Sequence, residues 1–329
     1  MRSFIHINAR TLNDALRALA EYNGKARLNA GGTDLIGVLK DGFLTEAPKA
    51  VVNIKTIPDL DGVDKDEGGL KIGALARLSD LANSPTIKGG CRVLAEAARA
   101  VGSPQIRNVA TIGGNLCQDI RCWYYRYPRH IGGPIQCLRK GSGPCLAVKG
   151  DNRYHAVMGG KKCFAVCPSD TAVALAALNA QIIIADVKGE RKVAVTEFYH
   201  PIGNELQNTE MVKAIEIPDI PGETRQAFLK FTLRESIDFA IVSVASIIAV
   251  ENGICTDARI ALGAVAPSPI RAKTAEKLIV GQPIDKDLAH EAARLALEKA
   301  RPLSRNAYKV EIAQTLVERA ILGQVPANP

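Results

Sequence analysis

The cysteines are the residues whose type and spacing point most directly to chemistry. Six of the eight lie in the segment 117–167, which is rich in Gly, Pro, Arg and Tyr and shows no sustained periodicity. A loop of this length without a core of its own needs a cross-link. Where nothing indicates an oxidising compartment, a metal is favoured over a disulfide. The candidate ligands are Cys122, Cys137, Cys145 and either Cys163 or Cys167.

The spacing of these thiols favours an iron–sulfur cluster over zinc. Structural zinc sites use paired CxxC knuckles, which this segment lacks. Intervals of 15, 8 and 18 residues, counted to the first choice of fourth ligand, suit a cluster held by four thiolates. Cys167 precedes Pro168, as in ferredoxin-type motifs, so spacing alone leaves the fourth ligand open. We interpret Cys91, Cys117 and Cys255 as packing residues.

Two glycine-rich turns could bind a pyrophosphate. They are Asn-Ala-Gly-Gly-Thr-Asp at 29–34 and Thr-Ile-Gly-Gly-Asn at 111–115. Glycines leave backbone N–H groups open to an anion, and a helix is predicted to follow the first turn. Neither turn matches the GxGxxG fingerprint or the Walker A loop. The chain also lacks GxSxG and HExxH, and its five histidines are scattered, so any redox chemistry must come from a cofactor.

The elements that must position these residues follow from periodicity and turn signals. Residues 1–55 alternate strand and helix signals, which predicts a small parallel βαβαβ sheet. Residues 56–218 have mixed patterns, interrupted by the loop 118–165, and Ser169-Asp170 predicts a helix start. The Pro- and Gly-containing segment 217–222 is the best domain boundary. Beyond it, three strand-like runs followed by three helical patterns predict an α+β domain over 219–329.

Composition bounds the class of protein. A chain of 329 residues that is 47% apolar suggests two to three globular domains. No stretch reaches the roughly 18 uninterrupted apolar residues of a membrane span. The N-terminus runs directly into strand-like sequence without an apolar signal segment, so we expect a cytoplasmic protein.

The net charge of +8 invites a nucleic-acid interpretation. No run of five or six basic residues occurs, so we interpret the excess as thinly spread and disfavour nucleic-acid binding. A charged face that docks a partner protein or an anionic cofactor explains the balance as well.

The turns and the C-terminal unit together resemble the FAD-binding medium subunit of the molybdenum hydroxylases, the xanthine dehydrogenase and carbon monoxide dehydrogenase superfamily. The matching segments are AGGTDL at 30–35, TIGGNLC at 111–117, PSD at 168–170, FLK at 228–230 with Arg234, DFAIVSVA at 238–245 and LGAVAP at 262–267. The resemblance implies a mixed α/β fold. A two-subdomain FAD-binding region of the PCMH/VAO type (1–218) would precede a C-terminal α+β domain with a three-stranded antiparallel sheet.

Family positions carried onto this sequence imply a set of FAD-binding residues. In the family both turns hold the pyrophosphate and ribityl chain, while an acidic and a basic residue lie near the flavin. The implied residues are Leu28, Asn29, Ala30, Gly31, Gly32, Thr33, Asp34, Leu35, Val101, Thr111, Ile112, Gly113, Gly114, Asn115, Asp170, Val212 and Lys230.

The loop 118–165 resembles an insertion that only a subgroup of the family has. In the β subunit of 4-hydroxybenzoyl-CoA reductase and in the FAD subunit of bacterial aromatic aldehyde oxidoreductases, four cysteines of this insertion bind a 4Fe-4S cluster. We match this sequence to the family insertion by counting forward from Asn115 and backward from Asp170. The match implies that the ligands are Cys122, Cys137, Cys145 and Cys163. The long interval before Cys163 is nearer the aldehyde oxidoreductase pattern.

The resemblance implies an electron-transfer subunit of a heterotrimer that oxidises an aldehyde or aromatic substrate. Electrons would come from a molybdopterin-binding large subunit through two 2Fe-2S clusters of a small subunit. They would leave through FAD and the 4Fe-4S cluster to a ferredoxin-like carrier or NAD. One alternative is 4-hydroxybenzoyl-CoA reductase, in which electrons flow inward from ferredoxin. An alternative of another class is a zinc-containing module that binds nucleic acid.

Overall fold

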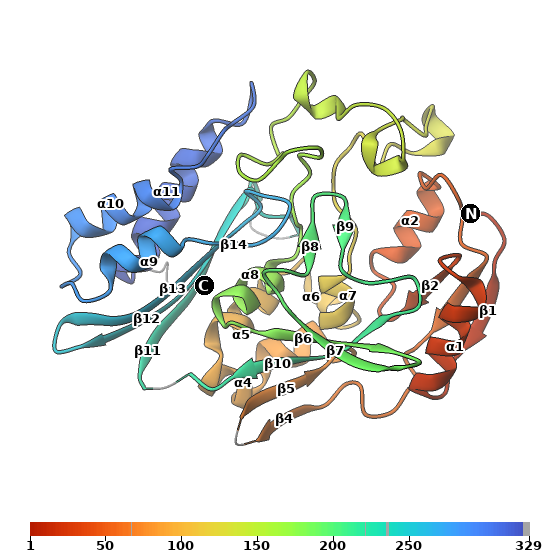
Figure 1. The fold of residues 1–329 in the computed structure, drawn as a ribbon, viewed down its shortest axis with the longest axis horizontal. Coiled ribbons are helices and arrows are strands. Elements are labelled where there is room, and N and C mark those ends of the chain that lie inside the picture. Colours follow the sequence, from red (N-terminus) through yellow and green to blue (C-terminus); the bar gives the residue numbers. More distant parts are fainter. Residues whose placement is uncertain (67, 221, 235–236, 325–329) are drawn as a thin grey trace.

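The N-terminal unit is a small parallel sheet with two helices (Figure 1). The computed structural model describes residues 1–66, 68–220, 222–234 and 237–324. Strands β1 (Ile5–Asn8) and β2 (Ala26–Asn29) both pair in parallel with the central strand β3 (Ala50–Asn53). Helices α1 (Leu12–Tyr22) and α2 (Leu35–Asp41) connect the strands. The element order predicted for residues 1–55 is confirmed.

Local signals explain these boundaries. The Thr11 hydroxyl accepts a hydrogen bond from the Asp14 N–H at 3.1 Å, and the Asp14 carboxylate accepts from the Thr11 N–H at 2.9 Å. This capping box starts α1, which ends at Asn23 in the left-handed region with a φ of 37°. The chain leaves β2 at Asn29, so the first glycine-rich turn lies at the carboxyl end of a parallel strand, where open α/β sheets bind ligands.

The second unit is built on a five-stranded antiparallel sheet. Its strands, in spatial order, are β4 (Val63–Asp66), β5 (Gly69–Gly73), β10 (Met211–Pro218), β6 (Gln181–Asp186) and β7 (Gly189–Ala194). A short hairpin, β8 (Tyr199–His200) with β9 (Gly203–Asn204), follows β7. The boundary segment predicted at 217–222 starts in the last residues of β10, and its Pro221 lies outside the described residues.

Six helices accompany this sheet. They are α3 (Leu78–Asn83), α4 (Pro85–Gly90), α5 (Arg92–Arg99), α6 (Pro104–Arg107), α7 (Ile112–Leu116) and α8 (Asp170–Ala177). Every residue of α8 is buried, and Ser169 caps the helix by accepting from the Ala172 N–H at 3.1 Å. The predicted helix start at Ser169-Asp170 is confirmed. The second glycine-rich turn forms α7, which packs against α8 and β10.

The cysteine-rich segment is an irregular loop, as its lack of periodicity predicts. Residues 118–169 contain only three single-turn 3-10 helices, at Arg129–Ile131, Leu138–Lys140 and Leu146–Val148. The loop crosses one face of the molecule between the N-terminal unit and the C-terminal domain (Figure 1). Backbone bonds anchor its far end there, because the N–H groups of Val157 and Met158 both donate to the carbonyl of Val265, at 2.8 and 3.0 Å.

In its described residues, the C-terminal domain has three long antiparallel strands and three helices. The strands are β11 (Thr224–Phe231), β12 (Val242–Glu251) and β13 (Ile254–Gly263), and the helices are α9 (Lys273–Ile279), α10 (Lys286–Ala296) and α11 (Tyr308–Leu322). The expectation of a three-stranded sheet needs one correction. A two-residue strand β14 (Ile270–Arg271) pairs with β13 and makes the sheet four-stranded. Two residues are too few to show a period in the sequence.

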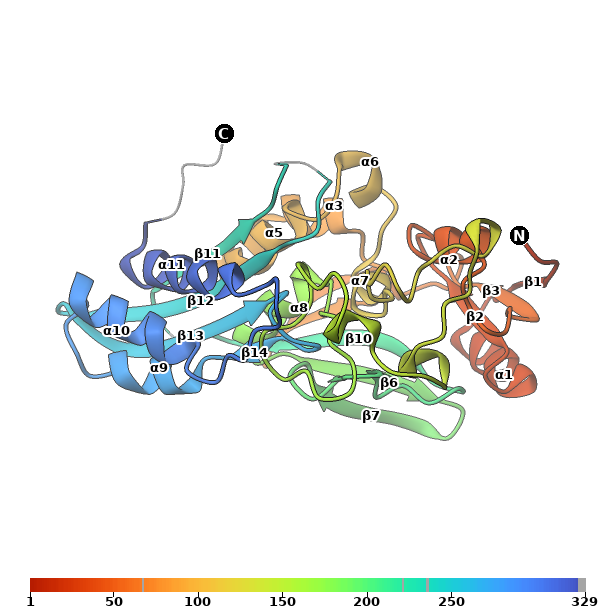
Figure 2. The same ribbon diagram turned by 90° about the horizontal axis from the view of Figure 1, so that it is seen from above.

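The three units lie in a row, with α1 at one end of the molecule and α9, α10 and α11 at the other (Figure 2). Among the residues that the structure describes, no helix is long and apolar enough to cross a membrane.

Candidate functional site

A cavity of about 830 Å³ lies where the N-terminal unit, the second unit and the cysteine-rich loop meet. Both glycine-rich turns line it, together with residues of β10, β11 and α8. Sixteen of the seventeen residues implied as FAD-binding line this cavity. The exception is Ile112, whose side chain is fully buried in the core and whose N–H donates to the Ala76 carbonyl at 2.9 Å.

The first turn approaches its neighbours so closely that only glycine fits. A Cβ on Gly31 would lie 2.0 Å from the Val109 carbonyl oxygen, and Gly32 has a φ of +71°. The Asn29 Oδ1 atom is buried without a hydrogen-bond partner. A buried acceptor left unpaired at a cavity wall is what a bound ligand with a hydroxyl or N–H donor would satisfy. The unpaired oxygen therefore fits a hydroxyl of the ribityl chain of FAD, whereas the N–H groups of the glycines suit its pyrophosphate.

The second turn is fixed by hydroxyl and amide side chains. Thr111 starts α7 and accepts from the Gly114 N–H at 3.2 Å. The buried Asn115 Oδ1 accepts from the hydroxyls of Ser169 at 2.6 Å and Thr171 at 2.7 Å. This oxygen is occupied within the protein, so the Asn115 side chain ties the turn to the start of α8.

A buried ion pair joins the second unit to the C-terminal domain at the cavity wall. The Lys230 ammonium lies 2.7 Å from the Asp170 carboxylate and also donates to the Ala100 carbonyl at 2.8 Å. The side chains are only 11% and 7% exposed. Burial raises the pKa of Asp170, and the ammonium opposes this rise. The lining residues Val101 and Val212 add apolar surface, so this part of the cavity combines a fixed ion pair with aliphatic walls.

The cysteine-rich loop supplies a wall of the same cavity that sequence reasoning did not assign. Ile120, Arg121, Tyr125 and Arg139 line it. The Asp34 carboxylate holds the loop there. It lies 2.9 Å from an Arg121 nitrogen and 2.7 Å from an Arg126 nitrogen, and it accepts from the Asp119 N–H at 2.8 Å. The basic and aromatic run 121–130 was the available signal, but its partner Asp34 is far away in the sequence.

Cys117 also lines the cavity and is exposed, so its interpretation as a packing residue is wrong. It directly follows α7 and is the C-cap residue of that helix. Cys91 and Cys255 are buried in the two largest apolar cores, which confirms that interpretation for them.

The four thiols implied as cluster ligands share one neighbourhood. Cys137 and Cys163 are buried in one small apolar cluster with Phe43 and Tyr125, and Cys122 packs against it. Burial raises the pKa of Cys122 to about 11, and the nearby thiols of Cys163 and Cys145 add to the rise.

Buried nitrogen atoms without a hydrogen-bond partner lie near these thiols. Burial lowers the pKa of the Lys140 ammonium, and the nearby thiols of Cys137 and Cys122 oppose this shift. The Lys140 Nζ and Arg139 Nε atoms are buried without a hydrogen-bond acceptor. The His155 ring lies 3.3 Å from the Cys122 sulfur through Nε2, and its Nδ1 is also unpaired. Buried donors of this kind fit an anionic group with several acceptors at the centre of the loop.

The alternative fourth ligand lies elsewhere. Cys167 belongs to the main core of the second unit, and its N–H donates to the Ala266 carbonyl at 3.0 Å. Across the described residues, no three His, Cys, Asp or Glu side chains are grouped closely enough to hold a single metal ion.

Comparison with known proteins identifies the family. A family model described as the FAD binding domain in molybdopterin dehydrogenase matches residues 2–220, about two thirds of the chain. The chain belongs to this family of FAD-binding medium subunits. A second model, the CO dehydrogenase flavoprotein C-terminal domain, matches residues 227–324 of this medium subunit.

Relatives of the medium subunit match most of its length. The aldehyde oxidoreductase FAD-binding subunit PaoB of Escherichia coli is 33% identical over 95% of this chain and 96% of its own. The nicotinate dehydrogenase FAD-subunit of Eubacterium barkeri is 28% identical over 86% of this chain and 82% of its own.

A solved structure shares the fold. The carbon monoxide dehydrogenase of Hydrogenophaga pseudoflava superimposes with a TM-score of 0.78 and 24% identity, over 98% of this chain and 96% of that one. The medium subunit is therefore the FAD-binding part of an oxidoreductase, as its resemblance to this family predicts.

Proposed function

We propose that this chain carries two redox groups, FAD in the 830 Å³ cavity and a 4Fe-4S cluster in the loop 118–165, and passes electrons between them. The observation that carries the proposal is that residues lining the FAD cavity also lie beside the cysteines of the loop. Tyr125 lines the cavity and packs in the same apolar cluster as Cys137 and Cys163, and Arg139 lines the cavity and acts electrostatically on Cys163. FAD supplies hydride and single-electron transfer, and the cluster supplies single-electron transfer.

The residues of this chain bind and orient the cofactors and do not themselves undergo the redox reaction. We propose that the two turns hold the pyrophosphate and ribityl chain, and that Asn29 donates or accepts through its side-chain amide there. The Asp170–Lys230 pair fixes the wall of the cavity beside the cofactor. The ion pairs of Asp34 with Arg121 and Arg126 hold the loop against the first turn.

We propose Cys122, Cys137, Cys145 and Cys163 as the cluster ligands. Cys163 is favoured over Cys167 because it packs beside Cys137 and acts electrostatically on Cys122, whereas Cys167 lies in another core. We favour a cluster over zinc because the loop lacks the paired CxxC knuckles of structural zinc sites.

The partners we propose are a molybdopterin-binding large subunit and a small subunit with two 2Fe-2S clusters. The aldehyde or aromatic substrate would be oxidised in the large subunit. The relatives named as medium chains and FAD-binding subunits support this assembly. We also propose the boundary near residue 218 between the FAD-binding region and the C-terminal domain, supported by the ranges of the two family models. We propose the cytoplasm as the compartment, because the four proposed cluster ligands must be reduced thiolates.

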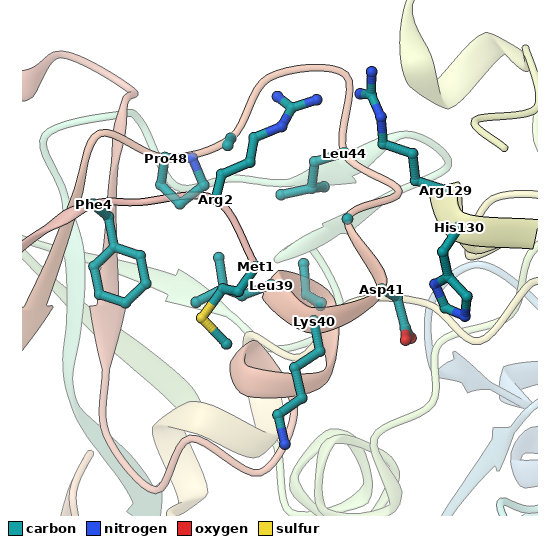
Figure 3. A pocket seen from close by; sticks show the side chains of 13 residues that line it. Met1, Arg2, Phe4, Leu39, Lys40, Asp41, Leu44, Pro48, Arg129 and His130 are labelled. Carbon is teal, nitrogen blue, oxygen red and sulfur yellow. The ribbon is translucent and has the colours of Figure 1, made fainter.

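For the external electron partner we propose an acidic, ferredoxin-like carrier, with NAD as the alternative. The interpretation of the basic excess as thinly spread is wrong. The loop 118–165 holds nine Lys and Arg residues against two Asp, and so carries +7 of the net +8. A cavity of about 380 Å³ lies where this loop meets α2. Figure 3 shows Arg2 and Arg129 on one side of its apolar residues and Lys40 on the other.

The direction of flow distinguishes the main proposal from 4-hydroxybenzoyl-CoA reductase. For an outward route, the cluster must accept electrons from the flavin, so its potential should lie at or above that of the flavin. A cluster potential far below that of the flavin, measured by redox titration, would favour the inward route from ferredoxin.

Iron and flavin analysis tests the cofactors. Anaerobically purified protein should be yellow-brown, with flavin bands and about four irons per chain. The Cys122→Ser variant should lose the iron and keep FAD, because the turns that line the cavity do not include Cys122. Cys255→Ser, a buried thiol of the C-terminal core, is the matched control and should keep both. Colourless protein that contains zinc would contradict the proposal.

A further inference from the structure

Lys309 in α11 is a fully buried lysine without an acidic partner. Its ammonium donates to the backbone carbonyls of His155 at 3.1 Å and Ala264 at 2.6 Å. None of the ion pairs of the described residues includes it. Lysine is almost never fully buried unless it is paired with an anion. Burial lowers the pKa of Lys309 to about 7, so the two carbonyls do not offset the cost of holding a charge there.

The position of this ammonium relative to the cysteine-rich loop is informative. The same His155 whose carbonyl accepts from Lys309 places its ring 3.3 Å from the sulfur of Cys122. One residue therefore separates the ammonium from a thiol proposed as a cluster ligand. Lys309 belongs to the C-terminal domain, so it approaches the loop from outside and is independent of the loop's own cations.

We propose that Lys309 is the electrostatic partner of the iron–sulfur cluster and raises its reduction potential, an inference that rests on the cluster proposed above. Four thiolates give the site a net negative charge, and each electron that it accepts adds to that charge. In the low dielectric of the interior a nearby ammonium stabilises the more negative, reduced state, and the negative charge of the cluster in turn favours the protonated form of Lys309. Lys309 positions a charge and does not touch the reacting atoms.

Holding the loop in place by hydrogen bonds to its carbonyls does not require a charged ammonium. The Asn306 side chain, a neutral donor one turn earlier, already bonds the His155 carbonyl at 3.1 Å and the Ala156 carbonyl at 3.3 Å. Asn306 therefore provides a matched control that loosens the same carbonyl without changing the charge.

The test compares the full chain, purified anaerobically, with Lys309→Met, Lys309→Gln and Asn306→Ala. Potentials are measured by titration with a reductant, the cluster by electron paramagnetic resonance and the flavin by absorbance. Both lysine variants should keep iron and shift the cluster to a more negative potential. The flavin potential should stay constant because Lys309 does not line its cavity. In Asn306→Ala the cluster potential should match that of the unaltered protein.

The outcomes separate this inference from the proposed function. Unaltered protein without iron would overturn the cluster, and the role of Lys309 with it. Iron-loaded Lys309→Gln with an unaltered cluster potential would overturn the role of Lys309 alone. Loss of iron from both lysine variants but not from Asn306→Ala would also overturn it, because Lys309 would then hold the loop rather than set the potential.

Discussion

At the scale of single residues, the FAD cavity is lined by positions at which close contacts or burial allow few other side chains. Gly31 faces the Val109 carbonyl, and Asn29 carries a buried oxygen without a partner. Lys230 and Asp170 are buried as a pair, so removing either would leave a charge without its counterpart. The turn 29–34 was predictable because its glycines and polar residues are adjacent in the chain. Its contact with residue 109 was not.

Gly31→Ala should weaken FAD binding. The added Cβ would overlap the Val109 carbonyl, so either the turn or its neighbour must move, at a cost of about 1–3 kcal/mol. We expect FAD affinity to fall by roughly tenfold or more, since about 1.4 kcal/mol corresponds to tenfold. Quenching of flavin fluorescence on titration into the FAD-free protein measures this.

The matched control is Gly37→Ala in α2, where a Cβ meets nothing within 4 Å. Alanine is the better helix former, so this variant should be more stable by about 0.5–1 kcal/mol and bind FAD normally. Equal FAD affinity in both alanine variants would refute the argument from close approach.

At the scale of elements, the cysteine-rich loop is ordered by what it touches. It has no strand or α-helix in residues 118–169 and therefore no internal ladder of hydrogen bonds. One part is attached to the first turn through Asp34, and its far end is attached to the C-terminal domain through Val265, which follows β13. The sequence predicted the irregular loop and its thiols, but ion pairs between residues 34 and 126 have no sequence signature.

Asp34→Asn should release the first part of the loop. The amide keeps the size of the side chain but loses the charge that pairs with Arg121 and Arg126, at a cost of about 1–3 kcal/mol. We expect faster proteolysis within residues 118–130 and a lower iron content after purification. Mass spectrometry of the early fragments locates the cleavage.

Asp41→Asn is the control for this change. Asp34 precedes the first residue of α2 and Asp41 is the last residue of that helix, and none of the ion pairs of the described residues includes Asp41. It should be cleaved at the rate of the unaltered protein. Cleavage of Asp34→Asn at that same slow rate would show that the ion pairs of Asp34 do not order the loop.

At the scale of the whole molecule, the charge is polarised. The loop 118–165 carries +7, and the remaining 281 residues together carry only +1. Five of its nine cations already interact with residues of the chain. Three of them form ion pairs, Arg121 and Arg126 with Asp34 and Arg153 with Asp151. The other two, Arg139 and Lys140, interact electrostatically with the cysteines of the loop. Arg129 is free of ion pairs in the described chain and lies at the 380 Å³ cavity with Arg2 and Lys40.

Electron transfer to an acidic carrier should therefore depend on salt and on these cations. The dithionite-reduced protein, mixed in a stopped-flow instrument with oxidised plant-type ferredoxin, should transfer electrons more slowly as ionic strength rises. The double variant Arg129→Glu with Lys40→Glu should reduce the second-order rate constant by roughly tenfold or more at low salt.

Lys299→Glu, a charge reversal at an exposed residue that follows α10 in the C-terminal domain, is the control and should change the rate little. Rates independent of both salt and the double reversal would exclude this docking face and favour NAD as the partner.

The sequence by itself determined the features that depend on neighbouring residues. These are the parallel βαβαβ order, the two glycine-rich turns, the helix start at Ser169 and the family. Short-range periodicity, capping and turn chemistry carry that information.

Only the tertiary structure decided which of these features meet. It placed both turns at one cavity, buried Ile112 away from it, exposed Cys117 within it and added β14 to the C-terminal sheet. It also brought Lys309 into contact with His155 of the loop, which lies 154 residues earlier in the sequence. The physical reason is that packing and buried charge act between surfaces that folding brings together, and separation along the chain does not record them.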